Sequence, residues 1–382
     1  MSNKSTWLTP LEICRKLVEF PTYEESGMRE CSEFLSKELV RLGFTVRLDR
    51  LHNVFAEKIF EGGSGTFLIN THFDTVGPSR RWVRDPLRAS LEGERLYGLG
   101  TADAKGGIAA TLDALERLKN CRFRKIEVLF SNYEDNNTVL DGQTWLGTPY
   151  FLEHNRLQAD FGINVEGTVR NDRFMISLGC GGRVGFTVTT VGKEAHSSDP
   201  RLGRNAIYDM MRVIEELRRI QPARMTVDGH EVYTELNVSV IQGGSAINIV
   251  PGECKITCER RVLPNEDWDQ VKIEVDKALS VLKGINFEVE FLKPQRSYLL
   301  DRTHPAAALA RESIMHTLGY EPGFRIESGR TDSIYFDQMA GIKTAILGPG
   351  ETEHEHVPDE SVNVKRLEEC SRILCHMLSK WE

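Results

Sequence analysis

No stretch of this sequence is apolar over the roughly 20 residues that a membrane-spanning helix requires. Its first six residues, MSNKST, also lack the apolar segment of a secretory signal peptide. We therefore expect a cytoplasmic protein with no membrane partner. A composition of 40% hydrophobic and 27% charged residues is typical of a soluble protein.

Paired cysteines and clustered cations are missing as well. The eight cysteines include no CxxC pair, and Cys254 and Cys258 lie in a strand-like run with the apolar Ile256 between them. This spacing favours reduced thiols in a core over a structural zinc or a disulfide. A net charge of −8 without a dominant basic cluster argues against nucleic acid as a partner.

The chain has 382 residues, more than a single hydrophobic core usually supports, so more than one domain is expected. Residues 1–182 and 294–382 alternate strand-like and helical segments. This pattern predicts one discontinuous α/β domain with a mixed, mostly parallel sheet and helices on both faces. Residues 183–293 follow a β-α-β-β-α-β order, which predicts an inserted α+β domain of the ferredoxin-like kind.

Hydrophobic periodicity places the individual elements. In the first domain we expect helices over residues 11–18, 31–42, 144–153, 306–318 and 364–378, and another that begins at 105; the strands are 45–48, 54–59, 67–70, 126–130, 161–165 and 344–347. In the inserted domain we expect strands over residues 184–191, 236–242, 255–261 and 287–292, and helices over 206–220 and 268–282.

Metal-type ligands stand in loops after the predicted strands. His72 and Asp103 each follow an extended stretch, and in α/β sheets such loops gather at the carboxyl ends of the strands. A nitrogen and an oxygen ligand suit a borderline cation such as zinc, whereas calcium and magnesium prefer oxygen alone. Asp74 lies two residues after His72, so it points the same way and can accept the second imidazole N–H.

Further carboxylates and histidines follow other predicted strands. Glu134 and Asp135 are adjacent and point in different directions, so one can bind metal while the other transfers a proton. Glu166 ends a strand, where a buried unpaired carboxylate is costly unless a cation accompanies it. His354 and His356 stand in a C-terminal loop. Taken singly, the acidic pair is equally typical of a solvated loop, and the two histidines are typical of a surface.

Together these candidates form one spaced series, His72-x-Asp74, Asp103, Glu134-Asp135, Glu166 and His356-x-x-Asp359-Glu360. The series resembles the two-zinc aminoacylase, carboxypeptidase and deacetylase family, which includes acetylornithine deacetylases and succinyl-diaminopimelate desuccinylases. The resemblance runs from about residue 8 to the C-terminus. Its most specific stretches are residues 81–86, 96–103 and 196–207, and they look most like acetylornithine deacetylases.

The resemblance implies a ligand set and a reaction. Asp103 would bridge two Zn²⁺ ions, for which Co²⁺ or Mn²⁺ can substitute. Glu134 would serve as general base and acid. The remaining ligands are then His72 and Glu166 at one ion, and Asp135 and His356 at the other. The implied activity is hydrolysis of the amide bond of an N-acyl-L-amino acid, with N2-acetylornithine as the leading substrate and arginine biosynthesis as the setting.

Two other functions remain open. The same chemistry serves a dipeptidase, a carboxypeptidase or a succinyl-diaminopimelate desuccinylase acting on a different amide. A non-catalytic paralogue could keep the fold as a ligand-binding protein. The presence of Glu134 beside a full set of ligands argues against that paralogue.

The resemblance also implies that the inserted domain is a lid and dimerisation domain, so that the protein is a homodimer. His196 would serve the partner subunit's site and donate to the tetrahedral oxyanion; a plain loop histidine beside a helix cap is the alternative. Asn248 and Arg261 match lid residues that contact substrate. Arg183 and Arg330, like Arg261, can grip a substrate carboxylate through bidentate hydrogen bonds or form surface salt bridges.

Three positions depart from the family's pattern. Asp135 stands where a second glutamate is common, and this shorter ligand would shift the metal or its occupancy. Gly167 replaces a usual proline. Asn136 and Asn137 replace small residues, which affects the expected substrate preference more than metal binding.

Overall fold

The computed structural model describes residues 7–380. They divide into two compact units. One comprises residues up to 178, 300–325 and those from 331, and the other comprises residues 179–299 and 326–330. The main segment of the second unit is therefore inserted within the chain of the first unit, and a short later segment also belongs to it.

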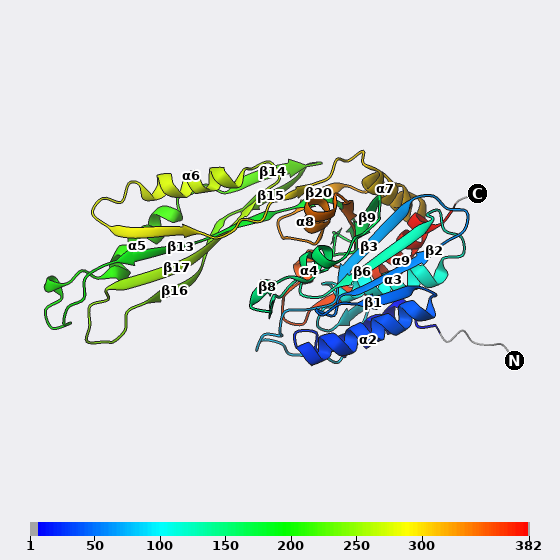
Figure 1. Ribbon diagram of the computed structural model, residues 1–382, viewed down its shortest axis with the longest axis horizontal. Helices are drawn as coiled ribbons and strands as arrows, with labels where there is room; N and C mark the ends of the chain where they lie inside the picture. Colours follow the sequence, from blue (N-terminus) through cyan, green and yellow to red (C-terminus); the bar gives the residue numbers. More distant parts are fainter. Residues whose placement is uncertain (1–6, 381–382) are drawn as a thin grey trace. The chain divides into compact units, whose positions relative to one another are not determined.

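The first unit is built on a mixed sheet (Figure 1). Its central strands are parallel, and antiparallel strands flank them on both sides. The order across the sheet is β1 (Thr45–Leu48), β2 (Val54–Ile59), β6 (Lys125–Ser131), β3 (Thr66–His72), β9 (Phe161–Asn164), β21 (Lys343–Ile346) and β12 (Ile176–Cys180). β20 (Phe324–Glu327) also pairs with β12, and β19 (Tyr298–Leu299) pairs with Gly179 and Cys180, the last residues of β12, which already belong to the second unit.

The sequence explains why the parallel strands lie in the centre. In β3 and β6 every residue after the first is buried, because both faces of these strands are covered. Nearly continuous apolar runs are typical of such strands. β1 and β2 coincide with their predicted ranges, and β3 extends two residues beyond its own, so that it ends on His72.

Helices cover both faces of the sheet. On one face, α3 (Lys105–Arg117) lies so close to the sheet that a Cβ on Gly107 would meet the Val165 carbonyl oxygen at 2.3 Å. α1 (Pro10–Val18) and α9 (Val364–Leu378) pack against α3, and α7 (Pro305–Leu318) packs against α9. α2 (Glu25–Arg41) packs along β1 and β2.

The other face is covered by α4 (Gly147–His154), α8 (Ser333–Tyr335) and the π-helical turn η2 (Phe336–Ala340). Phe151 of α4 and Phe336 of η2 pack in one buried cluster with Leu68 of β3 and Leu129 of β6. Because Gly107 approaches Thr71 and side chains alternate along a strand, Leu68 and Thr71 face opposite sides of the sheet.

Three small sheets complete the first unit. The most important for the site pairs β22 (Ser361–Asn363) with β5 (Arg95–Tyr97), which in turn pairs with β4 (Ser90–Glu92). The other two are hairpins, β7 (Thr138–Leu140) with β8 (Gln143–Trp145), and β10 (Val169–Arg170) with β11 (Arg173–Phe174). The short 3-10 turns η1 (Pro200–Leu202), in the second unit, and η3 (Thr352–His354) lie in loops.

The second unit contains an antiparallel four-stranded sheet in the order β16, β17, β13 and β18. Two helices pack on it and a hairpin precedes β16. The elements in chain order are β13 (Gly182–Val191), α5 (Ala206–Leu217), β14 (Ala223–Val227), β15 (His230–Thr234), β16 (Leu236–Gly243), β17 (Glu253–Val262), α6 (Trp268–Leu279) and β18 (Asn286–Phe291). Without the hairpin, this is a β-α-β-β-α-β unit whose core joins α5, α6 and one sheet face.

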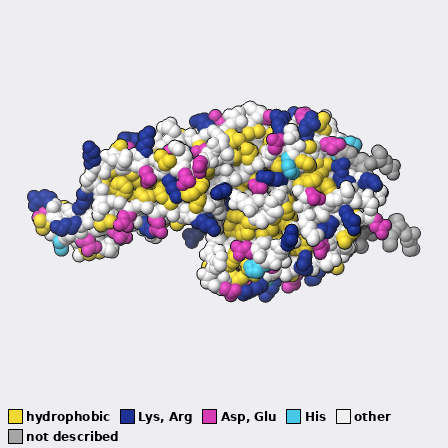
Figure 2. Space-filling model, turned by 45° about the horizontal axis from the view of Figure 1, so that its top comes forward, with side chains coloured by type: hydrophobic (Ala, Val, Ile, Leu, Met, Phe, Trp, Pro, Cys, Tyr) yellow, Lys and Arg dark blue, Asp and Glu magenta, His cyan; other side chains and the backbone are white. Residues whose placement is uncertain are grey.

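Charged side chains of both signs are interspersed over the visible face of the molecule (Figure 2). Within residues 7–380, no helix combines the length and the apolar character needed to cross a membrane.

Candidate active site and metal centre

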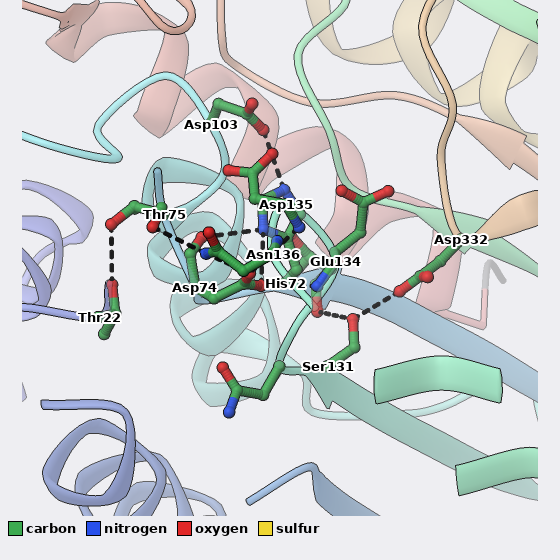
Figure 3. A network of polar contacts seen from close by, with 12 residues as sticks. Thr22, His72, Asp74, Thr75, Asp103, Ser131, Glu134, Asp135, Asn136 and Asp332 are labelled. Atoms are coloured by element: carbon green, nitrogen blue, oxygen red, sulfur yellow. Dashed lines mark hydrogen bonds and ion pairs between the residues drawn. The ribbon is translucent and has the colours of Figure 1, made fainter. Parts of the chain in front are cut away.

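The site is assembled from loops at the carboxyl ends of neighbouring parallel strands. His72 is the last residue of β3, while Glu134 and Asp135 follow β6 and Glu166 follows β9. These strands run parallel and side by side, so their ends share one sheet edge. Figure 3 shows His72, Glu134 and Asp135 converging there with Asp103, which stands just before α3.

Asp103 lies at the centre of this arrangement. Its Oδ1 is 3.0 Å from Nε2 of His72, and its Oδ2 is 3.0 Å from Nε2 of His356. Nε2 of His356 also lies 3.2 Å from Oδ1 of Asp135. One carboxylate thus stands between two imidazoles, and the second imidazole reaches another carboxylate.

The charges of these neighbouring groups and their burial shift one another's pKa values. Burial disfavours ionised Asp103, but the imidazoles of His72 and His356 outweigh burial and lower the pKa of this carboxyl. Hydrogen bonds to Asp103 and Asp135 raise the pKa of His356 to about 11. Burial, followed by the charge of Asp103, raises the pKa of Asp135 to about 6. Burial and the nearby Glu134 raise the pKa of Glu166 well above its usual range.

These residues fit a divalent metal. Ligand atoms of Asp103, Asp135 and His356 all lie within 4.8 Å of one another, and no other group of this kind occurs in the described part of the chain. His72 adds a nitrogen on the far side of Asp103. The mixture of imidazole and carboxylate ligands suits zinc-type cations. A cation would also relieve the crowding that raises the pKa values of Asp135 and Glu166.

Asp74 has a larger part than the sequence indicated. The carbonyl oxygen of Asp74 lies 3.1 Å from Nδ1 of His72, whereas its carboxylate oxygen lies at 3.5 Å. The carboxylate instead accepts backbone N–H groups from Glu134 at 2.9 Å, Asp135 at 3.1 Å and Asn136 at 3.1 Å. Asp74 therefore orients His72 through its backbone and fixes the acidic loop through its side chain.

Other buried polar residues hold Glu166 and the end of β6. The Asn164 side chain donates to Oε1 of Glu166 at 2.8 Å. Ser131 and Thr148 both donate to the buried carboxylate of Asp332, at 2.6 and 2.7 Å. Asp332 thus ties residues 331–333 to the strand that leads into Glu134.

The expected lid residues His196, Asn248, Arg183 and Arg261 lie in the second unit, and so does Arg330, which was expected in the first domain. His196 and Asn248 are neighbours, because Ser197 N–H donates to the Asn248 carbonyl and His196 pairs with Ile249. Arg183 and Arg261 face each other across β13 and β17. Both reach Glu259, at 3.5 Å from Arg183 and 2.9 Å from Arg261. Arg330 ends the segment 326–330.

Sequence reasoning linked Asn136 to substrate preference alone and gave no role to Asp332 or Glu360, although all three are hydrogen-bonded to residues of this site or of its loops. The side-chain NH₂ group of Asn136 makes two hydrogen bonds, one to the Asp74 carboxylate and one to the Thr75 carbonyl oxygen. Glu360 accepts hydrogen bonds from the Asp103 loop. The signal available for Glu360 was its acidic pair with Asp359, which begins three residues after His356. Asp332 had no local signal, because its partners are more than 180 residues away in the sequence.

Imidazole and carboxylate side chains gathered at the carboxyl edge of an α/β sheet are typical of a metallohydrolase. The chain belongs to peptidase family M20/M25/M40, whose model matches residues 68–380. The family and the α/β fold predicted from the sequence are thereby confirmed, and the protein is an enzyme of the metallopeptidase and amidohydrolase class.

The similarity to named proteins extends over nearly the whole chain. Acetylornithine deacetylase of Erwinia tasmaniensis is 28% identical, with 92% of each chain covered. The Vibrio campbellii enzyme of the same name is 26% identical over 94% of this chain and 93% of its own.

Solved structures share the fold. An M20 family metallo-carboxypeptidase of Sulfolobus solfataricus has a TM-score of 0.77 at 20% identity, with 97% of this chain and 98% of that chain covered. Human carnosine dipeptidase 1 has a TM-score of 0.76 at 15% identity, with 96% and 94% covered.

Proposed function

We propose that this enzyme hydrolyses the amide bond of an N-acyl-L-amino acid, with N2-acetylornithine as the preferred substrate, in the cytoplasm. The observation that carries the proposal is the Asp103 carboxylate between His72 and His356, next to the anchored loop of Glu134. Relatives that cover nearly the whole chain and are named acetylornithine deacetylase support the choice of substrate.

Two metal ions are part of the proposal, with His72, Asp103 and Glu166 at one and Asp103, Asp135 and His356 at the other. Zn²⁺ is the proposed metal, and Co²⁺ or Mn²⁺ can replace it. Bound there, the cations lower the pKa of a water molecule and polarise the scissile carbonyl. The shorter Asp135 still reaches the ligand cluster, because its oxygen lies 3.2 Å from Nε2 of His356.

The side chains then divide the proton transfers. Glu134 takes a proton from the attacking water and returns it to the departing amine. Asp74 supports this step by holding the Glu134 backbone N–H at 2.9 Å. Nδ1 of His196 accepts the Ser198 N–H at 3.1 Å, so the ring proton stands on Nε2 and can be donated to the oxyanion.

We assign recognition of the substrate carboxylate to Arg261 first. Asn248, Arg183 and Arg330 are further candidates for contacts with the substrate. Arg261 and Arg183 already share Glu259. A substrate carboxylate would therefore compete with Glu259 for their donors, and we expect a binding contribution that falls at high salt.

The proposed homodimer uses the second unit. β16 is an edge strand of its sheet, and its Val240 and Ile241 are 46% and 56% exposed. On α5, which packs against β16, Tyr208 and Met211 are 68% and 55% exposed. An exposed, apolar edge strand is a natural template for pairing with a second chain.

The decisive test is amide hydrolysis by metal-stripped protein with and without Zn²⁺ or Co²⁺. The substrates are N-acetyl, N-formyl and N-succinyl amino acids and several dipeptides. We expect metal to restore cleavage, fastest for N2-acetylornithine. Preferred cleavage of a dipeptide or a succinyl amide would replace this substrate by the dipeptidase or desuccinylase alternative. Metal binding without cleavage of any amide would favour a non-catalytic ligand-binding protein.

The role of His196 across the dimer has its own test. Co-expression of His196→Ala and Glu134→Gln chains gives mixed dimers in which one site has both an intact Glu134 and the partner's intact His196. If His196 acts in trans, random pairing should restore about a quarter of wild-type activity, although each variant alone is nearly inactive. No recovery in isolated mixed dimers would show that His196 does not serve the partner subunit.

A further inference from the structure

Glu360 connects the two loops that carry Asp103 and His356. Its side chain is buried, with 3% of the residue exposed. Oε2 accepts the Gly100 N–H at 2.8 Å, and Oε1 accepts the N–H groups of Ala102 at 2.8 Å and Asp103 at 3.1 Å. One carboxylate thus satisfies three backbone donors from a loop that lies far away in the sequence.

The backbone of Glu360 is held at the same place. β22 pairs with β5 so that Ser361 lies opposite Tyr97, and the Glu360 carbonyl accepts the Gly98 N–H at 3.0 Å. The β5 strand leads directly into the Asp103 loop, and Glu360 follows His356 by four residues. Strand pairing and side chain therefore fix the two loops to each other.

We infer that Glu360 is a positioning residue that sets the separation of Asp103 and His356 and thereby the geometry of the metal centre. This inference rests on the proposed metal-dependent function. Nε2 of His356 and Oδ2 of Asp103 are 3.0 Å apart. The side chain of Asp103 thus faces His356, while its backbone N–H is bound by Glu360. Release of the Asp103 loop would change this separation without removing a ligand.

A carboxylate is required because all three partners are donors. A glutamine has a single acceptor oxygen, and its NH₂ group would face at least one of the same backbone N–H groups. Glu360→Gln therefore leaves a buried N–H without an acceptor and pushes the loop away. Glu360→Asp keeps both acceptor oxygens on a side chain one methylene shorter, so it should restore part of the geometry.

The neighbouring Asp359 offers a matched control. It also accepts two backbone N–H groups, from Val83 at 3.1 Å and Arg84 at 2.9 Å, and the Arg84 guanidinium at 3.2 Å, so its hydrogen bonds go to residues 83 and 84 instead of residues 100–103. Asp359→Asn removes the same charge from the adjacent position. It should leave the binding of Co²⁺ unchanged.

The experiment titrates metal-stripped protein with Co²⁺ alone and follows both affinity and visible absorption. Mutation of a residue that orients a metal ligand through a hydrogen bond typically lowers metal affinity 10-fold to 100-fold. We expect Glu360→Gln to weaken Co²⁺ binding by roughly that factor and to alter the absorption band, Glu360→Asp to be intermediate, and Asp359→Asn to match wild type. Circular dichroism verifies that each variant is folded.

Wild-type Co²⁺ affinity and absorption in folded Glu360→Gln would overturn the inference, even if its thermal stability were lower. If Glu360→Gln does not fold, the same result in Glu360→Asp would overturn it. The outcome is independent of the substrate, because wild-type protein that binds Co²⁺ but cleaves none of the amides refutes the proposed function alone. Wild-type protein that binds no Co²⁺ refutes both.

Discussion

Glu134→Gln should reduce turnover by roughly 10²-fold to 10⁴-fold while leaving the bound metal nearly unchanged, because the substitution removes the proton acceptor without removing a ligand. The glutamine keeps the size of the side chain. It also keeps the backbone N–H that donates to Asp74, so the acidic loop should stay in place. Steady-state kinetics and elemental analysis of the same preparation measure both quantities.

The exposed Glu353 provides the matched control for this variant, because it stands in the loop before His356 and is not among the proposed ligands. Glu353→Gln removes one negative charge from the same region and should change turnover by less than about 2-fold, as surface charges usually do. Near-normal activity of Glu134→Gln would refute the proposed general base.

Much of the fold could be predicted from local patterns. β1, β2 and α9 have the ranges expected from the sequence, because short runs of strand-forming residues and one apolar helix face can be recognised without information from the rest of the chain. α2 begins at Glu25 instead of residue 31. Its first turns are polar apart from Met28, and Gly27 packs closely on Pro21, a tertiary contact that periodicity does not reveal.

Several hairpins were missed, and for two of them the sequence contains a strong signal. β7 and β8 are joined by Asp141 and Gly142, and β14 and β15 are joined by Asp228 and Gly229. All four residues have positive φ. Asp-Gly at such a two-residue turn is among the strongest hairpin signals. For the first hairpin, the expected helix over residues 144–153 overlapped the last two residues of β8, whereas α4 begins only at Gly147.

The site could be predicted as a set of residue types but not as a set of contacts. Strand ends identified His72, Glu134 and Glu166, since parallel strands deliver their loops to one edge. The position of Asp103 between two imidazoles depends on the pairing of β5 with β22, which joins segments more than 250 residues apart. No local pattern encodes that pairing, so the sequence showed the acidic pair of Asp359 and Glu360 but not the hydrogen bonds from Glu360 to the Asp103 loop.

Asp103→Ala should have the second of the two largest effects, since it removes the one carboxylate shared by both proposed metal sites. Its two oxygens lie 3.0 Å from His72 and 3.0 Å from His356. We expect bound metal to fall close to zero and turnover to fall on the order of 10³-fold or more, because metal ions contribute several kcal/mol and each 1.36 kcal/mol is tenfold. Elemental analysis and kinetics measure the two losses.

Thermal unfolding gives an independent measurement for Asp103→Ala. A metal that binds only the folded state stabilises it by about 2.7 kcal/mol at 100 times its Kd. Added Zn²⁺ should therefore raise the Tm of metal-stripped wild type and of Asp172→Ala, a control with a 75% exposed side chain, but not that of Asp103→Ala. His72→Ala, which removes a proposed ligand of one ion only, should keep part of the shift. Two bound metal ions per Asp103→Ala chain would show that Asp103 is not the shared ligand.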